Sequence, residues 1–281
     1  MQASITFIGG GNMAASLIGG LIANGHPAGD IKVVDPSEAR RAFLTDKHGV
    51  VCSAMTETDL AAQDVIVLAV KPQIMADVCQ NLAPLIQGAN PPLMLSIAAG
   101  IRSQSLQRWL GADAPIVRCM PNTPALIGSG ASALYADDQI DAQQRSLAES
   151  ILRCAGVTCW VDSEDLIDSV TAISGSGPAY YFLFTEALQA SGEALGLDTQ
   201  TARLLALQTA YGAACMALES TDSLTDLRQN VTSPGGTTER AIASLEENGL
   251  RSLVEQATQA AAERSRELAD ELGNTPDTED K

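Results

Sequence analysis

The chain has 281 residues, a formal net charge of −17 and only 4% aromatic residues. The strong negative charge argues against nucleic acid or an anionic membrane as partner, because both require a basic surface. The length is sufficient for two domains with a large core. No basic leader or apolar run of bilayer length is present, so we expect a cytoplasmic protein that binds a small molecule.

The first 160 residues alternate strand and helix patterns, which predicts an α/β domain over residues 1–162 with a Rossmann-like, doubly wound parallel sheet. Predicted strands cover 5–8, 31–34, 50–52, 64–70, 93–97, 116–120, 131–135 and 157–161. One predicted helix follows the first strand and stops at 24–25, and others cover 37–47, 56–62, 74–82, 103–110 and 142–154.

Strand patterns disappear beyond Asp162, and residues 163–272 predict an all-α domain that binds substrate and forms a dimer. Its predicted helices cover 165–173, 178–195, 199–219, 223–231, 237–247 and 250–272, with breaks at 174–178 and 232–236. The helix over 199–219 is apolar on nearly every face, so we expect a subunit interface; the alternative is a central helix of one bundle. The polar, acidic end, 273–281, is expected to be disordered.

A glycine loop follows the first strand directly: Gly9, Gly10, Gly11, Asn12, Met13 and Ala14. Between a strand and a helix, this G-x-G-x-x-A pattern indicates dinucleotide binding. Gly9 permits the tight turn, Gly11 lets a pyrophosphate approach the backbone, and Ala14 lets the helix pack closely. The alternative is a glycine-rich turn that only connects two elements.

Further loops stand at the carboxyl ends of later strands, where open α/β sheets bind their ligands. Together with the glycine loop they predict a cofactor rim, in which the glycine loop holds pyrophosphate and the others line the nicotinamide side. Each could instead be an ordinary turn between a strand and a helix. Their candidate contact residues are Ala69, Val70, Lys71 and Pro72; Ala98, Ala99 and Gly100; and Asn122 within Met120–Pro124.

Residues after the second strand carry conflicting signals for the 2′ group of the cofactor. Asp35 is placed to bond a ribose 2′-hydroxyl, which favours NADH. Ser37, Arg40 and Arg41 could instead receive a 2′-phosphate, although Ser37 also fits a helix N-cap. Both NADPH and NADH are therefore kept as cofactors, with NADPH slightly favoured.

The segment from Ser233 to Glu239 lies between two predicted helices and carries two glycines and two threonines. Exposed amides at a helix start suit a carboxylate. The alternative is a capped helix junction that only turns the chain.

The cysteine and histidine pattern predicts no metal site. The six cysteines form no C-x-x-C pair and are expected to be reduced thiols. His26 and His48 are the only histidines, which argues against a histidine general base.

These motifs together resemble pyrroline-5-carboxylate reductase, and the resemblance extends from Ile5 to about Leu268. It implies reduction of L-1-pyrroline-5-carboxylate to L-proline by NAD(P)H, the last step of proline biosynthesis. It also implies a homodimer with interlocked helical domains, possibly assembled into a decamer. The motifs are F-I-G-G-G-N-M-A (7–14), A-V-K-P (69–72), S-I-A-A-G (96–100), R-C-M-P-N-T-P-A (118–125), S-G-S-G-P-A-Y (174–180) and V-T-S-P-G-G-T-T (231–238).

The resemblance also implies roles for single residues. The Thr238 hydroxyl is the catalytic candidate, bonding the ring nitrogen as proton donor or as the group that orients a water. Amides of Gly236 and Thr237, with Ser233, are implied to hold the substrate carboxylate, and Val231 to pack on the ring. Ser176 and Gly177 are implied to line the cofactor. Since these residues and the cofactor loops fall in different predicted domains, we expect an interdomain site.

Two rival functions remain at this point. A β-hydroxyacid-type dehydrogenase shares this domain plan but commonly needs a lysine in the helical domain, and no lysine occurs between Asp162 and Thr275. A non-catalytic NAD(P)-binding protein would bind cofactor without turnover.

Overall fold

The computed structural model describes residues 3–55, 60–88, 90–111 and 114–273. The chain divides into two compact units, which we call the sheet unit and the helical unit. The sheet unit comprises the chain up to Ser176 and from Ala260 onward, and the helical unit is Gly177–Gln259. The division into sequence domains at residue 162 stays a prediction.

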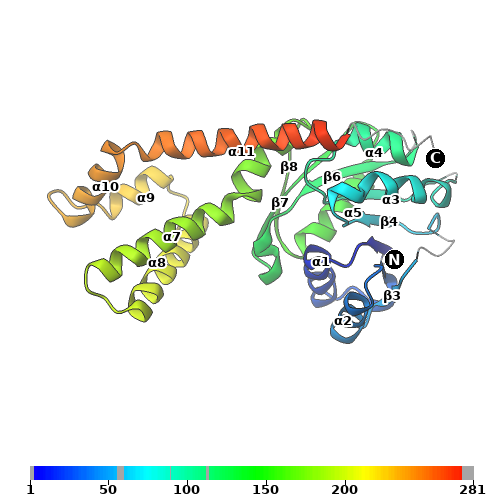
Figure 1. Ribbon diagram of the computed structural model, residues 1–281, viewed down its shortest axis with the longest axis horizontal. Helices are drawn as coiled ribbons and strands as arrows, with labels where there is room; N and C mark the ends of the chain where they lie inside the picture. The colour runs from blue at the N-terminus through cyan, green and yellow to red at the C-terminus, as the bar shows by residue number, and fades with distance from the viewer. Residues whose placement is uncertain (1–2, 56–59, 89, 112–113, 274–281) are drawn as a thin grey trace. The chain divides into compact units, whose positions relative to one another are not determined.

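The sheet unit contains one eight-stranded sheet in the order β3-β2-β1-β4-β5-β6-β7-β8. Strands β3, β4, β6, β7 and β8 are labelled in Figure 1. Adjacent strands pair in parallel except β6 and β7, so the predicted Rossmann-like, doubly wound sheet is confirmed, with one antiparallel pair that was not predicted. Only the short 3-10 helix η4 (Thr123–Ile127) links β6 to β7, and a parallel crossover needs a dozen or more residues. The strands are β1 (Ile5–Ile8), β2 (Ile31–Val34), β3 (Val51–Ser53), β4 (Val65–Leu68), β5 (Leu93–Ser96), β6 (Ile116–Met120), β7 (Gly130–Ala136) and β8 (Gly156–Trp160).

Helices of the sheet unit follow the predicted alternation. They are α1 (Asn12–Ala23), α2 (Glu38–His48), α3 (Met75–Leu82), α4 (Ser103–Leu110), α5 (Ala142–Arg153) and α6 (Leu166–Val170), with 3-10 turns η1 (Ala28–Asp30), η2 (Pro72–Ile74) and η3 (Ala83–Leu85). Of the helix predicted over 56–62, residues 56–59 lie outside the described residues, and 61–62 form a turn.

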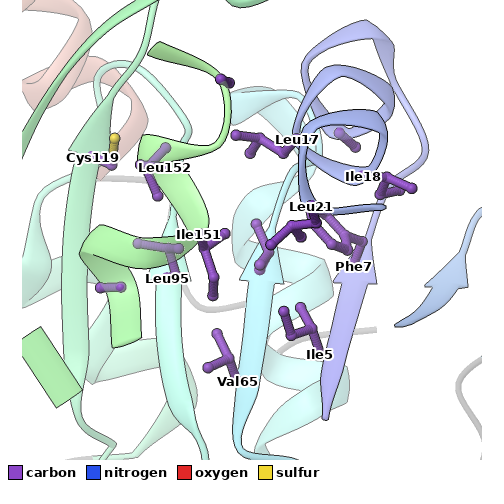
Figure 2. Close-up of a cluster of buried hydrophobic side chains, with 14 of the residues drawn as sticks. Ile5, Phe7, Leu17, Ile18, Leu21, Val65, Leu95, Cys119, Ile151 and Leu152 are labelled. Carbon is purple, nitrogen blue, oxygen red and sulfur yellow. The ribbon is translucent and has the colours of Figure 1, made fainter. Parts of the chain in front are cut away.

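Alternate side chains of the central strands point to opposite faces and build two cores. On one face, Phe7 and Val65 pack with Leu17 of α1 and Ile151 of α5 (Figure 2). On the other face, side chains of β4, β5 and β6 pack with Met75, Cys79 and Leu82 of α3 and Leu106, Trp109 and Leu110 of α4. The central strands β1, β4 and β5 are buried on both faces, as expected of a doubly wound sheet.

The predicted break at 174–178 is wrong. A π-helix, η5 (Thr171–Gly175), directly follows α6, and Ser176 keeps helical dihedral angles before α7 (Gly177–Ala194) begins. The Ser176 amide donates to the Thr171 carbonyl at 2.8 Å, a span of five residues that accommodates one extra residue per turn. Pro178 causes no break because it lies in the first turn of α7, where a missing N–H costs nothing.

The helical unit contains α7, α8 (Thr199–Glu219), α9 (Leu224–Asn230), α10 (Thr237–Glu247) and the first residues of α11 (Leu250–Gly273). α7 and α8 approach closely where a Cβ built on Gly192 would lie 3.2 Å from the Cβ of Ala202. Only Ala202 and Ala206 of α8 are buried, so the described residues leave most of this apolar helix uncovered. The alternative of a central bundle helix is therefore wrong.

The end of the chain is only partly described. Gly273 is buried as the last residue of α11, so the predicted disordered tail is wrong at this residue, while 274–281 lie outside the described residues. Among the helices that the structure describes, none is both long and apolar enough to cross a membrane.

Candidate functional site

The glycine loop follows β1, and its first residue has a backbone conformation that favours glycine. Gly9 has a φ of +100°, and a Cβ on it would lie 2.7 Å from the Ala69 carbonyl oxygen. Any side chain at this position would be strained and would push the loops after β1 and β4 apart. Two of the predicted cofactor segments therefore touch here.

The start of α1 is open to an anion. Gly11 is the N-cap, no side chain caps the helix, and its first turn holds no acidic residue. A Cβ on Gly11 would meet nothing within 4 Å, so a ligand can approach the backbone. Unsatisfied amides with free space before them suit a pyrophosphate, which the predicted contact residues Gly10, Asn12 and Met13 adjoin.

The Asp35 carboxylate holds the glycine loop to the start of α2. Its Oδ2 accepts from the Gly10 amide at 2.7 Å, and its Oδ1 accepts from the Ser37 amide at 2.8 Å. Asp35 thus positions the loop, a role that sequence reasoning missed because it considered only the ribose. Its bond to a ribose hydroxyl stays a prediction.

The two arginines after β2 bond to different segments: Arg40 to the glycine loop and Arg41 to the residue that follows β2. Arg40 donates from Nε and Nη2 to the Gly10 carbonyl at 2.8 and 2.6 Å, and its guanidinium lies 5.2 Å from the centre of the Phe43 ring. Arg41 donates to the Asp35 carbonyl at 2.8 Å. Ser37 is the N-cap of α2, and its hydroxyl accepts from the Arg40 amide at 3.4 Å.

The four predicted cofactor loops lie at one edge of the sheet. They follow β1, β4, β5 and β6, which are adjacent and parallel, so their carboxyl ends meet at the same edge. Lys71 is exposed there at the start of η2 with Pro72 and Val70 beside it, while Ala98 and Gly100 are buried and Ala99 is exposed.

The Asn122 side chain joins the loop after β6 to the π-helix. Its Nδ2 donates to the Ser174 carbonyl at 3.0 Å, and its Oδ1 accepts from the Ala131 amide at 2.9 Å. Asn122 therefore acts on the structure around Ser176, which follows η5 directly. Its predicted contact with a cofactor stays a prediction.

The turn from Ser233 to Thr238 lies wholly in the helical unit, where it follows α9 and includes the first two residues of α10. Gly235 has a φ of +72°, and the Gly236 amide donates to the Ser233 carbonyl at 2.9 Å. The Gly236 amide is therefore engaged, and no side chain caps the helix start, which leaves the amides of Thr237 and Thr238 facing outward from the first turn. The Thr238 side chain is half-buried, and Val231 is 61% exposed.

The predicted site residues thus form two sets. The glycine loop, the 69–72 and 98–100 loops, Asn122 and Ser176 belong to the sheet unit. Gly177, Val231 and the turn belong to the helical unit.

Thiols and metal ligands add no further chemistry to these sets. All six cysteines are free, and burial raises the pKa of Cys79 and Cys154 to about 12, so both remain protonated at neutral pH. Across the described residues, His, Cys, Asp and Glu side chains form no group of three that could hold a metal ion.

Comparisons with known proteins cover nearly the whole chain. A pyrroline-5-carboxylate reductase from Pseudomonas aeruginosa is 52% identical over 269 residues, covering 96% of this chain and 98% of the relative. The chain belongs to the pyrroline-5-carboxylate reductase family. The family profile "Pyrroline-5-carboxylate reductase dimerisation" matches residues 164–268, and "NADP oxidoreductase coenzyme F420-dependent" matches residues 4–100.

Solved structures of the pyrroline-5-carboxylate reductase family share the fold. The enzyme from Coxiella burnetii matches with a TM-score of 0.92 and 46% identity, covering 96% of this chain and 99% of the other. The Plasmodium falciparum pyrroline carboxylate reductase, solved with NADP bound, matches with a TM-score of 0.82 and 30% identity. This match covers 96% of the present chain and 99% of the other. A nicotinamide dinucleotide is the cofactor class that these matches support.

Glu239 is a functional candidate that sequence reasoning did not single out. It lies at the third position of α10, and its Oε2 accepts from the Gly235 amide at 2.7 Å. A glutamate three residues after an N-cap has the spacing of a capping box, and this spacing could have identified Glu239 from the sequence. The bond holds Gly235 in its left-handed conformation and so shapes the turn within this pyrroline-5-carboxylate reductase.

Replacing Glu239 with alanine is expected to raise the KM for pyrroline-5-carboxylate about threefold to tenfold, because an ordered cap contributes about 1 kcal/mol. The KM for NADPH should stay unchanged. Glu239→Gln keeps an oxygen acceptor and serves as the matched control in steady-state kinetics. Equal KM values for the alanine variant and the wild type would rule out this role for Glu239.

Proposed function

We propose that this protein reduces L-1-pyrroline-5-carboxylate to L-proline with a hydride from NAD(P)H. The observation that carries the proposal is the match to pyrroline-5-carboxylate reductases over 94% or more of the chain at 40–52% identity. The uncapped start of α1 and the two threonines at the start of α10 supply the chemistry that such a reaction needs.

The proposed roles of the chain's own residues follow from the substrate. The nicotinamide, when bound, supplies the hydride to the C=N carbon. A protonated iminium accepts a hydride more readily than a neutral imine, so the reaction needs a polar group within hydrogen-bonding distance of the ring nitrogen. The Thr238 hydroxyl orients this nitrogen or a water bonded to it; an alkyl hydroxyl is itself a weak acid.

The substrate carboxylate is proposed to bind at the start of α10. Amides of Thr237 and Thr238, together with the Ser233 hydroxyl, hold its oxygens, and the helix dipole adds attraction. The Gly236 amide contributes indirectly, by forming the turn with the Ser233 carbonyl. The exposed Val231 side chain packs on the ring. Fixed placement of this kind supplies much of the rate without a strong acid.

One assay separates the proposal from its two rivals. NAD(P)H oxidation is followed at 340 nm with pyrroline-5-carboxylate, and NAD(P)⁺ reduction with a panel of 3-hydroxy acids. We expect turnover with the imine only. Turnover with a 3-hydroxy acid alone would indicate the dehydrogenase, and cofactor binding without turnover would indicate a binding protein.

NADPH is the cofactor we propose, because two guanidinium groups and a hydroxyl gather where a 2′-phosphate would lie. Ser37, Arg40 and Arg41 all belong to the first turn of α2 or its cap. The Arg40 guanidinium has two nitrogens on the Gly10 carbonyl, which leaves Nη1 for an anion.

The double variant Arg40→Ala/Arg41→Ala is expected to weaken NADPH binding about tenfold more than NADH binding, since only NADPH carries the 2′-phosphate. Both dissociation constants are measured by quenching of protein fluorescence. Because Arg40 also holds Gly10, some loss for NADH is expected, and the ratio of the two constants is the readout. An unchanged ratio would remove these arginines from cofactor selection.

We also propose that the chain forms a homodimer through its helical unit. The dimerisation profile matches 164–268, and α7 and α8 expose a broad set of large apolar side chains. Many exposed large apolar side chains on two packed helices are typical of an interface rather than of a free surface. Those side chains are Tyr181, Phe182, Leu183, Phe184, Leu188, Leu204, Leu205, Leu207, Tyr211 and Met216.

A further inference from the structure

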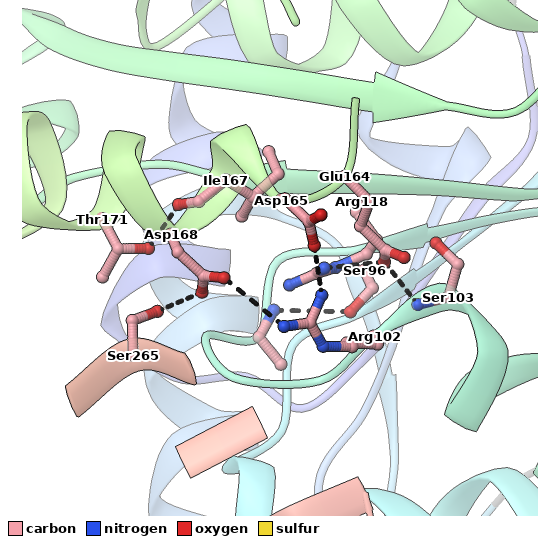
Figure 3. Close-up of polar contacts among 11 residues, drawn as sticks. Ser96, Arg102, Ser103, Arg118, Glu164, Asp165, Ile167, Asp168, Thr171 and Ser265 are labelled. Carbon is pink, nitrogen blue, oxygen red and sulfur yellow. Dashed lines mark hydrogen bonds and ion pairs between the residues drawn. The ribbon is translucent and has the colours of Figure 1, made fainter. Parts of the chain in front are cut away.

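The loop after β5, whose residues 98–100 are predicted cofactor contacts, is held at both ends by polar groups within the sheet unit. At its start the Ala98 amide donates to the Ser96 hydroxyl at 3.5 Å, and Ser96 is 1% exposed. At its end Arg102 and the Ser103 amide bond to carboxylates that precede or belong to α6 (Figure 3). The conformation of this loop is therefore set partly by α6.

Asp168 is the most buried of these carboxylates, at 5% exposure, and three chain segments meet on it. Its Oδ1 accepts from the Ser265 hydroxyl of α11 at 2.6 Å, and its Oδ2 lies 3.6 Å from the Arg102 guanidinium. A buried carboxylate with a charged and a neutral donor is fully dependent on those partners, because water cannot replace them. Asp165, the other partner of Arg102, is 85% exposed, so water can solvate its carboxylate.

α11 reaches the same loop through apolar contacts. Gly100 has a φ of +71°, and a Cβ on it would lie 3.4 Å from Leu268 and 3.5 Å from Leu272. Ser265 lies one turn before Leu268 on α11, so the bond to Asp168 fixes the helix that covers Gly100.

The helix that carries Asp168 continues to the second predicted cofactor contact. α6 passes into η5, where the Asn122 side chain holds the Ser174 carbonyl, and Ser176 follows. Asp168 thus connects the 98–100 loop, predicted to line the nicotinamide side, with the segment that ends at Ser176, predicted to line the cofactor. The glycine loop has its own support in Asp35.

We propose that Asp168 is a positioning residue that sets the 98–100 loop and the Ser176 segment for the nicotinamide half of the cofactor. This proposal rests on the proposed function in one respect only, namely that the protein binds a nicotinamide cofactor. Asp168 acts through Arg102 and Ser265 and does not itself touch the cofactor.

The test compares NADPH with ADP, which carries the adenosine and two phosphates but neither the nicotinamide riboside nor the 2′-phosphate. The proposed 2′-phosphate residues Ser37, Arg40 and Arg41 make no bond to Asp168, so the variants below leave them intact. Calorimetry on the full chain, without imine, is expected to show that Asp168→Asn raises the Kd for NADPH about tenfold, while the Kd for ADP changes less than about twofold. Asp165→Asn, which alters the exposed partner of the same arginine, should leave both constants unchanged.

Ser265→Ala provides a milder variant if Asp168→Asn does not fold, and should raise the Kd for NADPH about threefold. Folded variants that bind NADPH as the wild type does would overturn the proposal, as would equal losses for NADPH and ADP, which indicate general destabilisation. If the wild-type chain fails to reduce the imine but shows the expected binding pattern, the proposed substrate fails and the role of Asp168 stands.

Discussion

Replacing Thr238 with alanine is expected to lower kcat for imine reduction about 100-fold, the lower range for losing a group that assists proton transfer. The hydroxyl is half-buried in the first turn of α10, in a turn shaped by bonds that do not involve it. The fold of the turn should therefore survive the change. The Kd for NADPH should remain within about twofold of the wild type, because the predicted cofactor loops belong to the sheet unit.

Two matched variants make this measurement specific. Thr238→Ser retains the hydroxyl and should keep most of kcat, while Thr237→Ala removes a neighbouring hydroxyl and should chiefly raise the KM for the imine. Stopped-flow measurement of NADPH oxidation separates chemistry from product release. Unchanged single-turnover rates in Thr238→Ala would remove Thr238 from the mechanism.

Introducing two negative charges on α8 by substitution is expected to convert the proposed dimer into monomers. Leu204 and Tyr211 are seven residues apart, so they lie on the same side of the helix, and they are 65% and 67% exposed in the single chain. In the double variant Leu204→Asp/Tyr211→Asp, association would bury two unpaired carboxylates, at a cost of several kcal/mol each. A micromolar sample should therefore elute as a monomer in chromatography with light scattering.

The control for this variant is an equally exposed apolar residue in the sheet unit. Met55 is 78% exposed, and Met55→Asp should leave the mass of the particle unchanged. Circular dichroism of the double variant should retain the helical signal of the wild type. A wild-type monomer, or a double variant that stays dimeric, would contradict the proposed interface.

Element boundaries were predictable wherever local chemistry decides them. α8 begins and ends at the predicted Thr199 and Glu219, because the Asp198 side chain caps its first turn by accepting from the Gln200 and Thr201 amides. α10 likewise covers the predicted residues, since Gly235 and Gly236 end the preceding turn.

Predictions failed where more distant contacts decide the backbone. Glycine and serine at 174–177 predicted a break, yet the chain stays helical through a π-helix whose Ser174 carbonyl is held by Asn122. β7 runs antiparallel to β6 because the short connection through η4 returns the chain directly to the edge of β6. The spacing of apolar residues does not encode the direction of a strand.

The sequence by itself determined the chemical parts of this protein: a glycine loop after β1, a glycine turn with two threonines at the start of α10, and an apolar helix that needs a partner. These follow from residue type and short spacing, which act locally. Only the tertiary structure decided which groups support those parts. Asp35 on Gly10, and Asp168 between Arg102 and Ser265, join residues 25 to 97 positions apart, because hydrogen bonds and ion pairs form only where folding has brought donor and acceptor together.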